Sequence, residues 1–163
     1  MTQDCPCHSG LRYNACCEPY HAGAVAPTPE ALMRSRYAAF ALGLGDYLVD
    51  TLASGHPDLD DPRPALLRAL SGMKNVQRFQ RLLILHTAAT ATDGEVLFYA
   101  RIFGKGTTPA KRDDRSFAEL SRFTREDGAW RYAEGRLVPA PRLPKDPSTL
   151  DRAAFLRLFD EVR

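Results

Sequence analysis

The sequence predicts an α+β fold in which helices come first and an antiparallel sheet follows. Apolar residues recur at the three-to-four spacing of a helix between residues 28 and 72. From residue 76 onward the spacing changes to two, which is typical of strands. Two short turn sequences, Asp93-Gly94 and Asp127-Gly128, divide this second part into hairpins. Such an order indicates helices packed against one antiparallel sheet.

The composition is that of one ordinary globular domain. The chain has 163 residues, of which 44% are hydrophobic and 26% charged, so a core can form without disulfides. The net charge of +2 is too small for a general phosphate-binding surface, so nucleic acid is not indicated as a partner. No apolar run approaches the roughly 20 residues that cross a bilayer, and no signal-peptide pattern opens the chain. A cytoplasmic protein without a membrane segment is therefore expected.

A long helical stretch is expected over residues 28–53. Thr28 is a suitable N-cap, and Pro29 suits the first helical position. One apolar stripe follows at helical spacing and consists of Met33, Tyr37, Phe40 and Leu44. Two glycines, at 43 and 45, interrupt this stripe, so Asp46 is expected to cap a second short helix.

A further helix and four strands are expected next. The helix begins at Asp61-Pro62 and ends at Gly72, with Leu66, Leu67 and Leu70 facing inward. The strands are expected over residues 79–87, 96–103, 117–125 and 129–134. The second strand has one apolar face, formed by Val96, Phe98, Ala100 and Ile102. Residues 104–115 contain glycines, a proline and several charges, and they are expected to form an exposed loop.

The C-terminal part is expected to be a connector followed by one helix. Residues 138–148 contain four prolines, which favour an extended connection. Ser148 and Asp151 resemble a capping box at the start of the last helix. The apolar side of that helix consists of Leu150, Ala154, Phe155, Leu158, Phe159 and Val162.

All four cysteines of the chain lie in one short segment. They form the pairs Cys5-Pro6-Cys7 and Cys16-Cys17, eight residues apart. A secreted disulfide scaffold would spread its cysteines, whereas a cluster in a cytosolic chain favours a metal. Four thiolates suit one tetrahedral zinc ion, and a site closed by four protein ligands is structural rather than catalytic. The alternative is four reduced thiols that bind nothing.

Two histidines are alternative ligands that could replace one cysteine. His8 lies within the cysteine segment, and His21 follows Cys17 by four residues, which is within reach on a helix. For both histidines, an exposed side chain that binds no metal is the simpler interpretation.

The cysteine segment resembles a known zinc motif. Cys5-Pro6-Cys7, Ser9-Gly10, Tyr13 and Cys16-Cys17 are similar to the SEC-C motif, the zinc-binding tail of the bacterial protein-translocation motor. Further matches lie at Tyr20-His21-x-Gly23, residues 31–37, Phe117-x-Glu119-x-Ser121-x-Phe123 and Gly128-x-Trp130-x-Tyr132-x-x-Gly135. Together these motifs resemble the YchJ-like family of bacterial proteins over about residues 4–136.

This resemblance implies a cystatin-like or nuclear-transport-factor-2-like (NTF2-like) cone behind a small zinc knuckle. The implied parts are a knuckle over residues 1–26, an α+β domain over 27–137, and a connector with a helix over 138–163. Two features depart from the family. His8 stands where the motif usually has glycine, and no cysteine follows Cys17, so a second C-terminal knuckle is absent.

The main domain offers several candidate site residues without an assembled catalytic motif. The candidates are Arg34, Arg36, Tyr37, His86, Glu119, Ser121 and Tyr132. Glu119 shares one strand face with Phe117 and Ser121, and if that face is concave, Arg34 or Arg36 could pair with it. Such a pair is either a ligand site or an internal ion pair, and the simpler interpretation is the ion pair. A dyad of His86 with Asp46 or Glu119 is possible, but no spacing favours it.

The favoured hypothesis for function is a binding or adaptor module. The zinc knuckle would contact a protein partner from the chaperone, secretion or translation machinery. Four basic residues could assist an acidic partner: Arg12, Lys74, Arg78 and Arg81. The rival hypothesis is a small-molecule binder or enzyme that uses the cone pocket with Glu119 and an arginine. A third option is a homodimer formed through the sheet.

Overall fold

A computed structural model describes residues 3–106 and 113–163. It confirms the predicted α+β fold, with a helical part followed by a four-stranded sheet. The helical part contains η1 (Tyr13–Ala15), α1 (Glu18–His21), α2 (Pro29–Leu42), α3 (Gly45–Asp50), η2 (Pro57–Asp60), α4 (Arg63–Ser71) and α5 (Met73–Val76). The sheet contains β1 (Gln77–Ala89), β2 (Asp93–Gly104), β3 (Phe117–Glu126) and β4 (Ala129–Pro139). Two 3-10 turns, η4 (Ala140–Arg142) and η5 (Pro147–Thr149), lead to α6 (Arg152–Val162).

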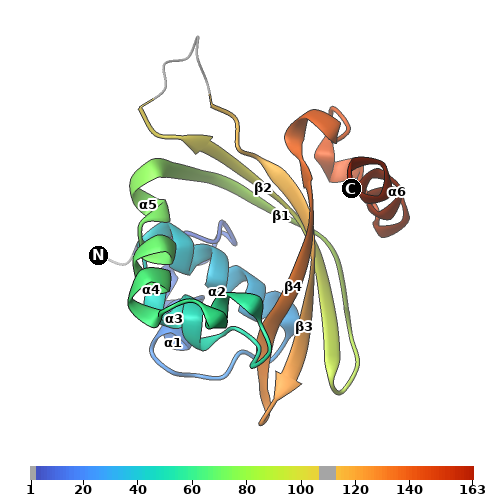
Figure 1. Cartoon of the computed structure of the whole chain (residues 1–163). Coiled ribbons are helices and arrows are strands. Elements are labelled where there is room, and N and C mark those ends of the chain that lie inside the picture. Colours follow the sequence, from blue (N-terminus) through green and yellow to red (C-terminus); the bar gives the residue numbers. More distant parts are fainter. Residues whose placement is uncertain (1–2, 107–112) are drawn as a thin grey trace.

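The sheet is a curved antiparallel meander with the order β1-β2-β3-β4. Figure 1 shows α1 to α5 on its concave side and α6 on the opposite side. Register shifts in β1 and between Arg122 and Phe123 of β3 mark irregularities of the kind that bend strands. The turn before β4 has positive φ at both central residues, 50° at Asp127 and 80° at Gly128, as a tight hairpin requires.

The long helix α2 begins and ends where its local sequence predicts. The Thr28 hydroxyl accepts a hydrogen bond from the Ala31 amide at 3.1 Å, and Gly43 ends the helix with a φ of 77°. The expected role of Asp46 is wrong, because Leu44 occupies the cap of α3 and Asp46 lies inside the helix. Asp46 instead faces the Arg63 guanidinium at 3.4 Å, a contact between helices that the local sequence does not encode.

Each face of the sheet covers its own apolar core. The predicted face of β2 is buried against α2 on the concave side, and its members are Val96, Phe98, Ala100 and Ile102. The convex side carries a second cluster under α6, in which Phe155 is fully buried against Leu97, Leu120 and Val138. The apolar side predicted for the last helix therefore packs on the chain's own sheet.

The C-terminal part differs from the sequence prediction in two places. Strand β4 continues to Pro139, five residues beyond the predicted end, because Glu134 to Val138 pair with β3 on its edge. Ser148 does not cap the last helix, since Asp151 accepts the hydrogen bond from Ala154 and Ser148 bonds to Asp146 instead.

The loop predicted over residues 104–115 is described only in part. Gly104 is buried and ends β2, whereas residues 105–106 and 113–115 are exposed. Residues 107–112 lie outside the described residues. Within the described ranges, no helix is long and apolar enough to cross a bilayer.

Candidate metal centre and ligand pocket

The four cysteines converge on one point near the N-terminus. Their Sγ atoms all lie within 4.8 Å of one another. The Cys7 and Cys16 sulfurs are 3.5 Å apart, and those of Cys16 and Cys17 are 3.9 Å apart. Four sulfurs bound tetrahedrally at about 2.3 Å from a zinc ion are separated by about 3.8 Å. The donor set and its spacing therefore fit a tetrahedral metal ion.

A short hairpin brings the two cysteine pairs together. Asp4 and Arg12 form an isolated bridge, and the Cys5 amide donates to the Leu11 carbonyl at 2.8 Å. The turn that joins the two arms of this hairpin requires left-handed backbone at His8, with a φ of 61°, and at Gly10, with a φ of 87°. The adjacent cysteines, 16 and 17, stand directly before α1, where the turning backbone directs both toward the first pair.

The cluster is largely buried, and its thiols influence one another's pKa values. Cys5, Cys7 and Cys17 are buried, and burial raises the pKa of the Cys5 thiol to about 11. A hydrogen bond with Cys17 lowers the pKa of Cys7 to about 4, and that same bond raises the pKa of Cys17 far above its usual range. Without a cation the cluster thus favours one thiolate, whereas a divalent ion would stabilise the others.

Two side chains outside the cluster contact its sulfurs. The Ser9 hydroxyl lies 3.2 Å from the Cys16 sulfur, and the Arg34 guanidinium lies 4.0 Å from the Cys7 sulfur. Arg34 also donates to the Cys7 carbonyl at 3.4 Å and pairs with Glu30 at the same distance. Arg34 therefore lies beside the cysteines and not in the cavity, where the sequence hypothesis placed it.

Neither histidine of this region points its ring nitrogens at the cluster. His8 is exposed, and its Nε2 lies 3.1 Å from the Phe79 carbonyl of β1. His21 is half-buried rather than exposed, because its two ring nitrogens contact the Tyr13 hydroxyl at 2.6 Å and the Ser35 carbonyl at 2.8 Å. Both histidines tie the cysteine segment to the main domain.

The cysteine segment is part of the concave core. Cys5, Cys7 and Cys17 belong to the same apolar cluster as Leu32 and Tyr37 of α2. Figure 1 shows α1 against the helical layer. The position of the cysteine cluster is thus fixed relative to the sheet.

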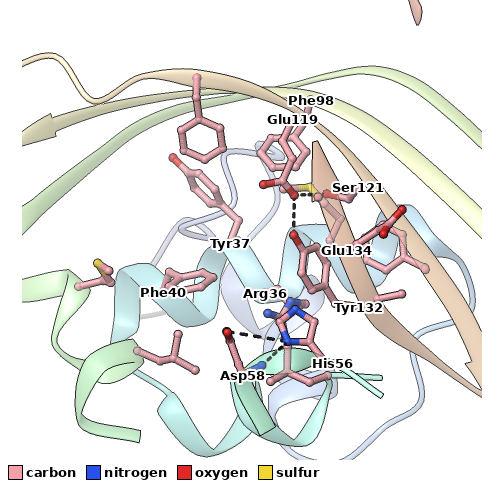
Figure 2. Close-up of a pocket in the computed structure, with 18 of the residues that line it drawn as sticks. Arg36, Tyr37, Phe40, His56, Asp58, Phe98, Glu119, Ser121, Tyr132 and Glu134 are labelled. Carbon is pink, nitrogen blue, oxygen red and sulfur yellow. Dashed lines mark hydrogen bonds and ion pairs between the residues drawn. The ribbon is translucent and has the colours of Figure 1, made fainter. Parts of the chain in front are cut away.

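A cavity of about 590 Å³ lies between the helices and the concave face of the sheet. Its apolar lining comes from α2, β2, β3 and the short helices, and Figure 2 shows several aromatic side chains around it. Five of the predicted candidates line it: Arg36, Tyr37, Glu119, Ser121 and Tyr132. The volume is in the range of pockets that hold small molecules.

Glu119 is the central polar group of this cavity. Its Oε2 accepts hydrogen bonds from the Ser121 hydroxyl and from the Tyr132 hydroxyl, the latter at 3.0 Å (Figure 2). Among the described residues no partner bonds to Oε1, and this atom is not sealed from the cavity. Burial raises the pKa of Glu119, and burial together with the Glu119 charge raises that of Tyr132.

Arg36 reaches the same site but does not pair directly with Glu119. Its guanidinium donates to the Leu48 carbonyl at 2.7 Å and contacts the Thr51 hydroxyl. It also lies 4.8 Å from the centre of the Tyr132 ring. Burial lowers the pKa of Arg36 to about 10, so the group remains charged near neutral pH. The ring of Tyr132 thus joins Arg36 and Glu119 in place of the direct pair that the sequence suggested.

His86 lies outside this site. It contacts Glu95 at 3.1 Å, and Arg152 of α6 donates to the same carboxylate at 2.6 Å. The three groups lie in β1, β2 and α6, so the dyads of His86 with Asp46 or Glu119 are wrong.

The sequence did not single out His56 and Asp58, which also line the cavity. The His56 ring packs 5.7 Å from that of Tyr132, and its Nδ1 accepts from the Asp58 amide at 3.1 Å. Both residues lie in or beside the short η2 segment, where turn composition gives no sign of a site.

Comparison with known families matches the two parts just described. The model of the YchJ middle domain, described as NTF2-like, matches residues 28–135, and the SEC-C motif matches residues 1–19. The chain belongs to the YchJ family. The YchJ family members include the UPF0225 protein YchJ of Shigella dysenteriae, which is 40% identical over 139 residues and covers 83% of this chain and 84% of its own length. A UPF0225 protein of Xanthomonas campestris is 40% identical over 136 residues, covering 83% and 95%.

Solved structures agree with the YchJ fold. The solution structure of a SEC-C motif-containing protein from Rhodopseudomonas palustris has a TM-score of 0.69 at 34% identity, over 83% of this chain and 99% of that one. A crystal structure of a SEC-C motif-containing protein from Psychrobacter arcticus has a TM-score of 0.63 at 24% identity, over 99% and 97%. The second likeness supports the fold alone.

Proposed function

We propose that this protein binds a small, mostly apolar molecule in its concave cavity and that one structural zinc ion holds the cysteine segment against the cavity wall. The observation that carries the proposal is a cavity of about 590 Å³ whose apolar lining surrounds the partly satisfied carboxyl group of Glu119. An apolar pocket with a few convergent polar groups is the usual form of a small-molecule site.

The zinc ion would act through the wall of the pocket. His8 follows Cys7, bonds to the Phe79 carbonyl and packs its ring 5.8 Å from that of Tyr37. Tyr37 and Phe79 both line the cavity, and their rings form an edge-to-face pair at 5.6 Å. Fixing the cysteines would therefore fix two aromatic side chains of the site. Zinc is the ion that best matches four thiolates in a closed tetrahedral site.

A thermal-shift screen of small apolar molecules against the zinc-loaded protein tests the pocket. Met73 lines the cavity at its helical end, so Met73→Trp should fill space there and abolish any shift. Val76 is 49% exposed on the same short helix and does not line the cavity, so Val76→Trp is the matched control. Hits that survive Met73→Trp, or no hits across broad chemical classes, would count against a pocket function.

A second candidate function is the adaptor role, and one observation favours it. Leu11 in the cysteine hairpin is 54% exposed and Val25 after α1 is 62% exposed, so residues 3–26 present two large apolar side chains to solvent. The basic side chains Arg12, Lys74, Arg78 and Arg81 are also exposed. We propose that a protein of the chaperone, secretion or translation machinery would contact this surface.

Co-sedimentation with purified ribosomes and binding to purified translocation motor test the adaptor role. Leu11→Asp should weaken a specific complex because it places a charge at the contact. Leu137→Asp is the control, since Leu137 is 44% exposed on β4. Equal binding by wild type and Leu11→Asp, or none by either, would argue against the adaptor role.

A further inference from the structure

One end of the cavity combines a carboxylate oxygen with aromatic rings. Oε1 of Glu119 has no hydrogen-bond partner among the described residues, because both donors that reach this group bond to Oε2. Figure 2 shows Glu119, Phe98 and Tyr37 under the sheet at the same end of the cavity. A ligand that enters the cavity therefore meets Oε1 beside ring surfaces.

The rings at this end form two edge-to-face pairs. Tyr37 and Phe79 have their centres 5.6 Å apart, and Phe98 and Phe117 have theirs 5.9 Å apart. All four side chains line the cavity. Aromatic faces attract cations, and this attraction grows when water is excluded. A carboxylate adds a charge-assisted hydrogen bond to the same ligand group.

The charges around the cavity also favour a cation. Asp58 and Glu119 are two carboxyl groups on the lining, against the single guanidinium of Arg36, and Asp58 also faces the His56 ring at 3.9 Å. Arg36 already donates to the Leu48 carbonyl and lies over the Tyr132 ring, which Figure 2 shows between Arg36 and Glu119. The remaining carboxylate on the lining, Glu134, contacts Arg122 at 3.3 Å and is directed away from the other labelled polar groups.

We propose that the end of the cavity between Glu119, Tyr37 and Phe98 binds an organic ammonium group, so that the ligand is an amine with an apolar body. This inference rests on the proposed pocket function and names its ligand class. The ammonium group would donate to Oε1 of Glu119 and face the rings, and the apolar body would fill the cavity toward α4 and α5.

Three probes with one apolar body test the proposal: phenylbutylamine, phenylbutanol and phenylbutyrate. Their affinities are measured by calorimetry on the zinc-loaded full chain at about pH 8, where the amine stays charged. We expect the amine to bind at least about tenfold more tightly than the alcohol, and the carboxylate most weakly. Glu119→Gln should remove the advantage of the amine, because it replaces the charged acceptor with a neutral amide, and leave the affinity for the alcohol within about twofold, because a hydroxyl can also accept from the amide NH2.

Two controls separate the possible failures. Glu134→Gln removes a carboxylate that lies elsewhere on the lining, and it should preserve the preference for the amine. Thermal unfolding of each variant confirms that it is folded. Equal affinity for amine and alcohol, or tighter binding of the carboxylate, overturns the ammonium site while leaving a pocket that binds apolar molecules. Binding of none of the three probes overturns the pocket function and this inference with it.

Discussion

His8 adopts a backbone conformation that glycine takes at little cost and other residues rarely take. Its φ of 61° lies in the left-handed region, and the SEC-C motif usually has glycine at this position. The resemblance therefore identified the position, but not why histidine occupies it. The structure shows an interaction that compensates for the backbone cost: the His8 ring forms a hydrogen bond with the Phe79 carbonyl, 71 positions away in the sequence. Such a long-range partner is not encoded in the local sequence.

A matched pair of variants separates the backbone cost at His8 from its hydrogen bond. Both His8→Gly and His8→Ala remove the bond to Phe79, but only alanine must hold a φ of 61° with a Cβ atom. We expect His8→Ala to be less stable than His8→Gly by about 1 kcal/mol. Urea unfolding of the zinc-loaded variants measures the difference. Equal stability of the two variants would show that the loop relaxes to another conformation.

Glu119 should make the stability of the fold depend on pH. Burial raises its pKa above the ordinary value of 4.5, so over the interval between these two values the native state holds a proton that the unfolded state has lost. Stability from this group is thus complete below pH 4.5 and is lost as the pH rises through the raised pKa. The free energy of unfolding of wild type relative to Glu119→Gln should fall as the pH rises above 4.5 and through the raised pKa.

Urea denaturation of the two proteins across this pH range measures that difference, and loss of metal at acidic pH affects both proteins alike. The difference between wild type and Glu119→Gln therefore reports the contribution of the carboxyl group alone. A difference that is constant with pH, or that grows as the pH rises, would mean that Glu119 is ionised at little cost in the folded protein.

At the scale of elements, capping and turn residues predicted the ends that depend on local chemistry. Thr28 and Pro29 begin α2, and Asp127-Gly128 forms the last hairpin turn. The predictions failed where the end of an element depends on contacts with another element. Strand β4 continues to Pro139 because β3 offers backbone partners for the additional residues, although their sequence contains no strand pattern. The predicted apolar side of α6 was confirmed, but only the structure shows that it covers the convex face of the sheet.

The packing of α6 depends on one aromatic side chain. Phe155 is fully buried among Leu97, Leu120 and Val138. We expect Phe155→Ala to lower the free energy of unfolding by about 3 to 5 kcal/mol, because it removes a fully buried ring and leaves a cavity in this cluster. Arg157→Ala on the exposed side of α6 should change it by less than about 0.5 kcal/mol. Urea unfolding compares them, and a loss below about 1 kcal/mol for Phe155→Ala would show that α6 contributes little to the fold.

At the scale of the whole molecule, the cysteine spacing predicted a metal-binding cluster, and the change from helical to strand spacing predicted the order of the layers. The shared core of the two parts was not predictable, because no pattern in residues 1–26 indicates which surface they cover. The candidate pocket was predicted only in part, because some of its residues come together only in the fold. Alternation placed Glu119 and Ser121 on one face, whereas His56 and Asp58 approach from a turn that only the fold brings near.

This shared core makes metal removal a test of the entire concave side. Trp130, the single tryptophan of the chain, is 6% exposed and belongs to the same apolar cluster as Cys5, Cys7 and Cys17. We expect about one zinc ion per chain in wild type and none in Cys16→Ser, because three remaining thiolates leave the closed site incomplete. Removing the ion with a chelator should then lower the unfolding temperature and shift the emission of Trp130, since metal-binding energy contributes to folding.

Zinc content by elemental analysis, tryptophan emission and thermal unfolding are measured on the same samples, and returning zinc should restore all three signals. Ser9→Ala is the control, since it removes a hydroxyl that contacts the Cys16 sulfur at 3.2 Å but keeps all four thiolates. It should bind zinc more weakly without losing it. Loss of zinc with an unchanged Trp130 signal and unfolding temperature would mean that residues 1–26 fold as an independent appendage, and the link between metal and pocket would then be abandoned.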